Sequence, residues 1–196
     1  MKRKSNVGYI AGAIILLAVL FFIITYNGLV KKEENVKLQW NEVQNAYQRR
    51  TDLIPNLVNV VKGQADFEQT TLQKITEARA KAMSVNYSGE ELTAEKLKAH
   101  TTAQNELANA ANNLIVVVEK YPTLQGTAAF RGLQTQLEGT ERRIKIARKD
   151  FNEAVAVYNS SVRGFPASIA AGILGFKAKD GFLSDAGAEK IIEVKF

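Results

Sequence analysis

The hydrophobic pattern begins with an almost unbroken apolar run. Residues 7–26 are nearly all apolar, and no charged residue lies between Ser5 and Val30. At about 1.5 Å of rise per residue, a helix of this length spans the ~30 Å hydrocarbon core of a bilayer. A cleaved signal peptide has a shorter apolar region that ends at a small-x-small site, and this run offers no such site. The pattern therefore predicts a retained transmembrane helix over residues 7–26, preceded by a short basic segment, residues 1–6.

After residue 30 the apolar positions recur at spacings of three and four, which is typical of a helix in a bundle or coiled coil. The stripe comprises Val36, Trp40, Val43, Tyr47, Arg50, Ile54, Leu57 and Val61. Pro55 lies within it, and proline is tolerated in the first turn of a helix but removes a hydrogen bond from the interior. Residues 31–83 are therefore expected to form either one kinked helix or two helices joined near Thr51.

Two later segments show the same periodicity. After a polar loop, Thr93 caps a helix whose seam comprises His100, Ala103, Leu107, Ala110, Leu114, Val117 and Tyr121. After a second turn, Thr127 begins a longer helix, ending near Val162, with Phe130, Leu133, Leu137, Ile144, Ala147, Phe151, Ala154 and Tyr158 on one face. The chain is thus predicted to be all-α: an N-terminal transmembrane helix, an up-and-down antiparallel bundle of four-helix type over residues 31–164, and a tail over residues 165–196 that packs on the bundle or lies near the membrane.

The order of the helices decides where that tail lies. With four bundle segments in up-and-down order, the 84–92 loop and the segment after Val162 both return to the bilayer. The apolar stretch at residues 169–176 would then lie near the headgroups, although it is too short to span. With one kinked helix over residues 31–83, the tail would instead lie at the distal end.

Composition and charge exclude several classes of protein. There is no cysteine, which excludes disulfides and thiolate metal sites. The net charge is +6, but the segment Lys2-Arg3-Lys4 carries three of those charges, which leaves too mild an excess to indicate nucleic acid binding. Three basic side chains before the apolar run face two after it, Lys31 and Lys32. This bias predicts a single-pass cell-membrane protein with a cytoplasmic N-terminus and the bundle outside.

Several short motifs occur along nearly the whole chain. They are Arg49-Arg50, the run Asp52-Leu53-Ile54-Pro55-Asn56-Leu57-Val58, Tyr121-Pro122, Glu141, Arg148, Phe151-Asn152, Tyr158-Asn159 and Phe165-Pro166. In this order and at these distances they resemble the LemA family, although that family often has tyrosine where this chain has Phe151. The resemblance implies a bacterial membrane-anchored bundle and supplies no activity. It marks Asp52, Pro55, Asn56, Arg148, Asn152, Asn159 and Pro166 as candidate structural or interaction residues.

The charged positions add two more candidates. Arg50 falls in an apolar phase, where a guanidinium must reach solvent or find a carboxylate, and Glu141 is a candidate partner. This arrangement is either an ion pair that fixes helix register or a polar site inside the bundle. Around it, Glu138 and Arg142, and Glu141 and Lys145, have the spacing of stabilising pairs on one helix, which predicts a solvated, salt-bridged face.

No catalytic, cofactor-binding or metal-binding residue is predicted. His100 is the only histidine, so neither a Ser-His-Asp triad nor a histidine metal site can form. We therefore expect a scaffold or adaptor of the bacterial cell envelope and not an enzyme, held in the lipid bilayer by residues 7–26 and acting on an unidentified protein partner. The alternative is an envelope sensor that binds a small ligand between helices, which a polar cavity around Arg50 and Glu141 would favour.

Overall fold

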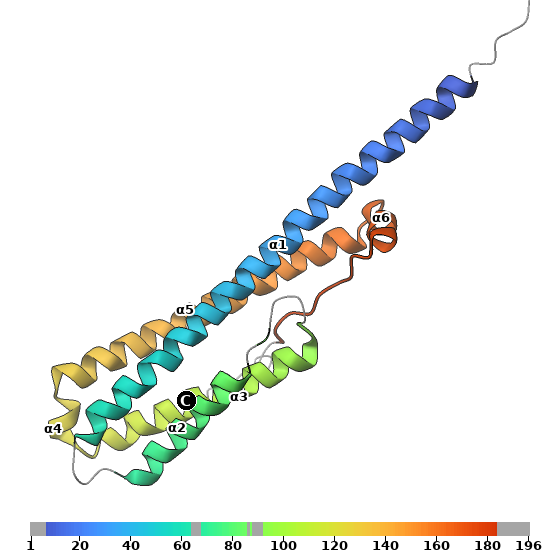
Figure 1. Ribbon diagram of the computed structural model, residues 1–196. Coiled ribbons are helices and arrows are strands. Elements are labelled where there is room, and N and C mark those ends of the chain that lie inside the picture. Colours follow the sequence, from blue (N-terminus) through green and yellow to red (C-terminus); the bar gives the residue numbers. More distant parts are fainter. Residues whose placement is uncertain (1–6, 64–67, 86, 88–91, 184–196) are drawn as a thin grey trace, which may run out of the picture.

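The fold is all-α, as predicted. A computed structural model describes residues 7–63, 68–85, 87 and 92–183, and these residues contain no strand. The helices are α1 (Val7–Lys62), α2 (Gln69–Ser84), α3 (Ala94–Val118), α4 (Pro122–Gln125), α5 (Ala128–Arg163) and α6 (Ala167–Leu174). Figure 1 shows α1, α2, α3 and α5 running in alternating directions, with the short α4 at the distal turn. The expected up-and-down order is therefore present.

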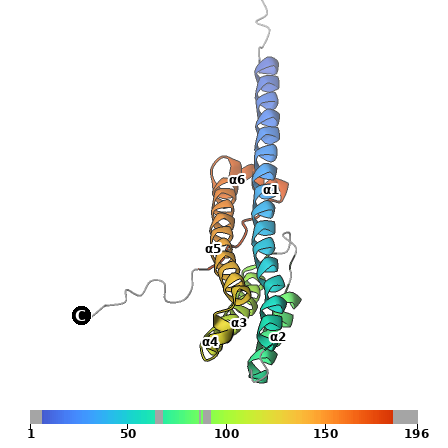
Figure 2. The same cartoon turned by 90° about the vertical axis from the view of Figure 1, so that its left-hand side faces the viewer.

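The four long helices form two pairs. α5 packs along α1, and α2 packs on α3 as a shorter hairpin against the distal part of α1. Figure 2 shows that α1 alone continues beyond α6. Among the described residues α1 is the one helix long and apolar enough to cross a membrane, and its apolar end is not buried by protein. This end fits membrane anchoring, and it continues into the bundle without a break.

The first helix passes through Pro55 and ends only at Lys62, so both alternatives for residues 31–83 were wrong. Proline has no backbone N–H, which leaves the Thr51 carbonyl without its usual partner one turn earlier. Arg79 of α2 supplies a replacement, because its Nε donates to the Thr51 carbonyl oxygen over 3.0 Å. A side chain of α2 therefore replaces the hydrogen bond that Pro55 cannot make. The sequence pattern around Pro55 could not indicate this residue.

The predicted apolar stripe of α1 is confirmed, since each of its eight positions is at most 4% exposed. On α3 four predicted positions are buried: His100, Ala103, Leu107 and Leu114. Two others are displaced by one residue, because Ala111 and Val118 are buried in place of Ala110 and Val117. A strict seven-residue repeat departs from the 3.6-residue turn of a straight helix by about 20° per heptad. The α3 seam follows the straight helix and not the repeat.

The two ends of the bundle are built differently. In the 84–92 loop, Tyr87 accepts hydrogen bonds at its carbonyl from Trp40 Nε1 and Gln44 Nε2, over 3.0 and 2.8 Å. Trp40 lies fourteen residues along α1 from Tyr26, or about 21 Å, so Tyr87 lies far from the apolar end of α1. The C-terminal segment lies beside that end, because the rings of Phe176 and Tyr26 lie 5.8 Å apart. Of the two segments expected near the bilayer, the described residues thus place the C-terminal one next to the apolar part of α1.

Candidate functional site

A charged layer separates the two apolar clusters of the core. Arg50 is 2% exposed and lies between the cluster around Trp40 and the cluster around Leu57. Its Nη1 donates to Glu141 Oε1 over 2.7 Å, and its Nη2 donates to the backbone oxygen of Gln104 over 2.9 Å and to Oε1 of the same residue over 2.6 Å. The structure thus joins the two residues that the charge pattern paired, and adds Gln104, which sequence reasoning missed.

His100 belongs to the same layer and is held uncharged. Its ring centroid lies 4.9 Å from that of Tyr47 and 5.5 Å from that of Trp40, and its Nδ1 has no hydrogen-bond partner among the described residues. Burial, followed by the charges of Arg50 and Arg148, lowers the pKa of His100 from 6.5 to about 4. The imidazole is therefore a neutral core side chain at physiological pH.

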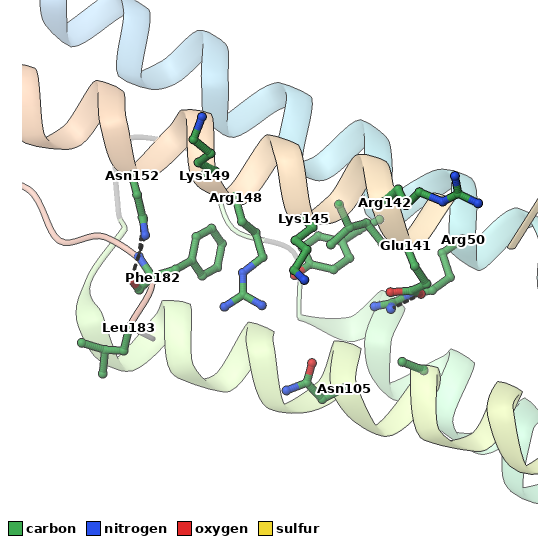
Figure 3. A pocket seen from close by; sticks show the side chains of 13 residues that line it. Arg50, Asn105, Glu141, Arg142, Lys145, Arg148, Lys149, Asn152, Phe182 and Leu183 are labelled. Atoms are coloured by element: carbon green, nitrogen blue, oxygen red, sulfur yellow. Dashed lines mark hydrogen bonds and ion pairs between the residues drawn. The ribbon is translucent and has the colours of Figure 1, made fainter. Parts of the chain in front are cut away.

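A groove opens beside this layer between α3 and α5, and Tyr47 and Arg50 of α1 also line it (Figure 3). Its volume is about 610 Å³. The lining residues are Tyr47, Arg50, Asn105, Ala108, Glu141, Arg142, Ile144, Lys145, Arg148, Lys149, Asn152, Phe182 and Leu183. The groove exists because α5 packs on α1 while α3 packs on α2, so that α3 and α5 remain apart.

The groove is strongly basic. Five of its lining side chains are cationic and one, Glu141, is a carboxylate. Within the described ranges, Arg142, Lys145 and Lys149 form no ion pair. The predicted pairing on the α5 surface was therefore wrong: Glu141 binds the buried Arg50, which has few other partners, and Glu138 accepts a hydrogen bond from Gln134 over 3.2 Å. These cations remain available to an anionic ligand.

An extended tail segment forms one end of the groove, and two asparagines of α5 hold it. Asn152 donates to the carbonyl of Phe182 over 3.0 Å and accepts from its N–H over 2.8 Å. Asn159 makes the same two bonds, both of 2.8 Å, to the backbone of Lys179. The asparagines are seven residues apart on one helix face, about 10.5 Å, which matches three extended residues at about 3.4 Å each. The two elements are therefore in register.

Further contacts fix this tail against the bundle. Phe182 is buried against the rings of Trp40 and Phe151, and the Arg148 guanidinium lies 4.7 Å above the centre of its ring. Lys179 Nζ lies 2.9 Å from Glu33 Oε1 on α1. The extended segment thus covers the part of the α1 and α5 pair that the shorter hairpin leaves open.

We predict that Asn152→Ala and Asn159→Ala each lower the free energy of unfolding by about 1–3 kcal/mol, because each strands two backbone groups beside the helix. Asn→Asp at either site keeps the acceptor for the N–H but places a carboxylate oxygen against the carbonyl oxygen, so it should destabilise the chain as well. Chemical denaturation of the full chain in detergent micelles measures this. The control is Asn109→Ala, an exposed asparagine of α3. A loss at Asn109 as large as at Asn152 would refute the role of the two asparagines.

The remaining candidates lie away from the groove. Asp52 accepts a hydrogen bond from Gln48 over 2.8 Å, and Asn56 is exposed beside it. Pro55 lies inside α1, and Pro166 precedes α6 at the opposite end of the bundle. The structure therefore brings together Arg50, Glu141, Arg148 and Asn152, with Asn159 one step further along the tail.

Sequence reasoning missed the α3 wall, Asn105 and Ala108, and the tail residues Phe182 and Leu183. The one available signal was the seven-residue spacing of Phe151-Asn152 and Tyr158-Asn159. It places two amide side chains on one face beside a buried seam. Among the residues that the structure describes, no three His, Asp or Glu side chains gather as a metal site.

Comparison with known proteins gives consistent matches. The model of the LemA family matches residues 39–196. Magnetosome proteins MamQ 2 and MamQ 1 of Paramagnetospirillum magneticum are each 30% identical over 188 residues, which cover 85% of this chain and 69% of theirs. Protein LemA of Metamycoplasma hominis is 24% identical over 158 residues, covering 75% of this chain and 68% of its own. The similarity thus extends through the bundle and the tail.

Proposed function

This chain belongs to the LemA family, and from that premise we propose that it is a membrane-tethered adaptor whose basic groove binds an acidic segment of a partner protein. The observation that carries the proposal is the groove between α3 and α5, with five cationic side chains and one carboxylate. Charge complementarity of this kind steers a partner and fixes its register. No catalytic step forms part of the proposal.

The position of the groove favours a protein over lipid as its ligand. Arg50 lies twenty-four residues along α1 from Tyr26, about 36 Å, and Trp40 beside Phe182 lies about 21 Å away. Electrostatic attraction between exposed charges fades over about 8 Å at physiological salt. Headgroups are therefore too distant to neutralise the groove, whereas a partner reaching the bundle from the side is not.

The shape of the charge distribution favours an elongated ligand. The cationic residues follow α5 from Arg142 to Lys149, and the groove extends from Glu141 to Asn152. Eleven helical residues are about 16 Å, the length of about five extended residues. Apolar contacts from Ile144 and Leu183 would accept the non-acidic side chains of such a segment.

A second candidate is a sensor of a small anionic ligand. The observation in its favour is the volume of about 610 Å³ beside Arg50 and Glu141, which falls within the ~300–1,000 Å³ range of small-molecule sites. Against it, the cationic groups do not converge on one point: Arg148 and Lys145 point toward α3, whereas Lys149 and Arg142 extend away from it (Figure 3). We also propose, from the flanking charges of α1, that the bundle lies outside the cytoplasmic membrane.

The test measures binding of a fluorescein-labelled peptide in which glutamates alternate with leucines, using the full chain in phosphatidylcholine nanodiscs. Lys145→Gln/Lys149→Gln should weaken binding about 5- to 10-fold, because two groove cations are lost. The matched control, Lys74→Gln/Lys98→Gln, removes two exposed lysines outside the groove and should change little. A peptide with glutamine for glutamate should not bind.

Equal weakening by both lysine pairs would reject the groove as the binding site. Inorganic pyrophosphate distinguishes the second candidate, because a compact dianion should raise the Tm only if a small-ligand site exists. If the rise in Tm depends on Lys145 and Lys149, and the protein does not bind the acidic peptide, the sensor function is supported and the adaptor function is rejected.

A further inference from the structure

α6 exposes an apolar face. Ile169 and Ile173 are 56% and 70% exposed, and their spacing of four places them on one side of the helix. Phe165, two residues before the helix, is 85% exposed. The opposite side, Ala170 and Ala171, is buried against the bundle. No charged residue occurs between Arg163 and Lys177. A contiguous exposed apolar face of this kind marks a surface that another apolar phase covers.

The position of α6 indicates what that phase is. Ala171 shares a buried cluster with Leu29 of α1, and Phe176 contacts Tyr26 at a ring distance of 5.8 Å. If residues 7–26 occupy the ~30 Å hydrocarbon core, Tyr26 lies at its edge, where tyrosine side chains are enriched. Figures 1 and 2 both show α6 beside α1 where the isolated part of that helix begins. α6 therefore lies at the depth of the headgroups.

The charges around α6 fit that depth. Arg163 and Lys177 flank the helix and are exposed, and Lys31 is exposed one turn past Tyr26 on α1. Basic side chains next to an apolar face reach lipid phosphates while their stems and neighbours stay in apolar surroundings. With eight residues, α6 is about 12 Å long and cannot span the bilayer.

We propose that α6 is an interfacial membrane helix, whose Ile169 and Ile173 face enters the boundary between headgroups and acyl chains beside α1, together with Phe165 just before the helix. α6 is then a second attachment point. A bundle held by one helix can rotate about that helix, whereas two attachment points fix which side of the bundle faces the membrane. This inference is independent of the groove and of its ligand.

The absence of cysteine from the chain allows a direct test. Single-cysteine variants Ile169→Cys and Ile173→Cys of the full chain, labelled with an environment-sensitive NBD dye, are reconstituted in phosphatidylcholine and phosphatidylglycerol vesicles. Nitroxide groups on the acyl chains should quench both labels about three-fold more strongly than a label at Val116→Cys, since interfacial helices enter roughly 5–10 Å. Val116 is exposed near the end of α3 that leads into α4, whereas α6 follows the other end of α5.

Two outcomes would overturn the proposal. If aqueous iodide quenches the Ile169 and Ile173 labels as it quenches the Val116 label, the face is in water. If neither iodide nor the lipid nitroxides reach these labels, protein covers the face, and dilution of the chain in lipid then tells whether a second copy does so. Circular dichroism of each labelled variant verifies that the bundle is intact, and two independent positions guard against a local effect of one label.

Discussion

Glu141→Leu is expected to lower the free energy of unfolding by about 2–3 kcal/mol, because it leaves the Arg50 guanidinium buried without its counter-charge. Arg50 is 2% exposed, and within the part of the chain that the structure describes its Nε already has no hydrogen-bond partner, so little compensation remains. Glu141 itself is 44% exposed at its side chain, which places the expected cost below that of a fully buried pair. Thermal and chemical denaturation of the full chain in micelles give the value.

The double variant of Arg50 and Glu141 gives a more specific prediction than the single variant, because the effects of the two substitutions should be coupled. Arg50→Met removes the buried charge together with its need for a partner, so Glu141→Leu in that background should cost almost nothing. Arg50→Met alone should cost about 1–3 kcal/mol, because Gln104 Oε1 is left buried without a donor. Additive losses in the double variant would show that the two side chains act separately. A clear gain in stability from Arg50→Met with intact folding would show that the pair is not required.

Acidification should destabilise the bundle through His100. The pKa of its imidazole is lowered from 6.5 to about 4 in the folded chain, so between these values the unfolded chain binds the proton more readily. Stability contributed by the neutral imidazole is thus complete above about pH 6.5 and is lost as the pH falls toward 4. A separation of this size corresponds to about 3 kcal/mol at most.

Carboxylates also titrate in this range, and a matched variant separates them. His100→Leu fills the space among Trp40 and Tyr47 with an apolar side chain and has no proton to bind. The difference in free energy of unfolding between the natural chain and this variant should change by up to about 3 kcal/mol between pH 6.5 and 4. Two parallel stability curves would mean that the buried imidazole takes no part in acid sensitivity. Above pH 7 the difference should be constant.

Sequence reasoning succeeded where a structure depends on local periodicity. The α1 stripe from Val36 to Val61 follows the helical repeat, because each buried position is fixed by neighbours three and four residues away. The threonine caps at Thr93 and Thr127 are equally local, and both accept hydrogen bonds from backbone N–H groups, of Lys96 and Phe130. On α3 the predicted buried positions departed from the observed ones only gradually, because a seven-residue repeat drifts relative to the turns of a straight helix.

Apart from the phase on α3, the failures concern partners far apart in the chain. Whether Pro55 ends α1 was decided by Arg79 of another helix. The surface pairs expected along α5 did not form, because Arg50, ninety-one residues from Glu141, takes that carboxylate. A carboxylate gains more by pairing with a buried guanidinium that has few alternative partners than with an exposed lysine that water already solvates.

Composition and local spacing were enough to predict the apolar span, the all-α class, the helical stripes and a charge in an apolar phase, Arg50, that needed solvent or a partner. Each of these follows from the composition and spacing of residues within a few turns, where helix geometry is fixed in advance. Contacts between distant segments, in contrast, keep α3 and α5 apart to leave a basic groove, bind the tail to Asn152 and Asn159, and bring Phe176, just after α6, beside Tyr26. These depend on which surfaces meet, a choice among distant contacts that local spacing does not specify.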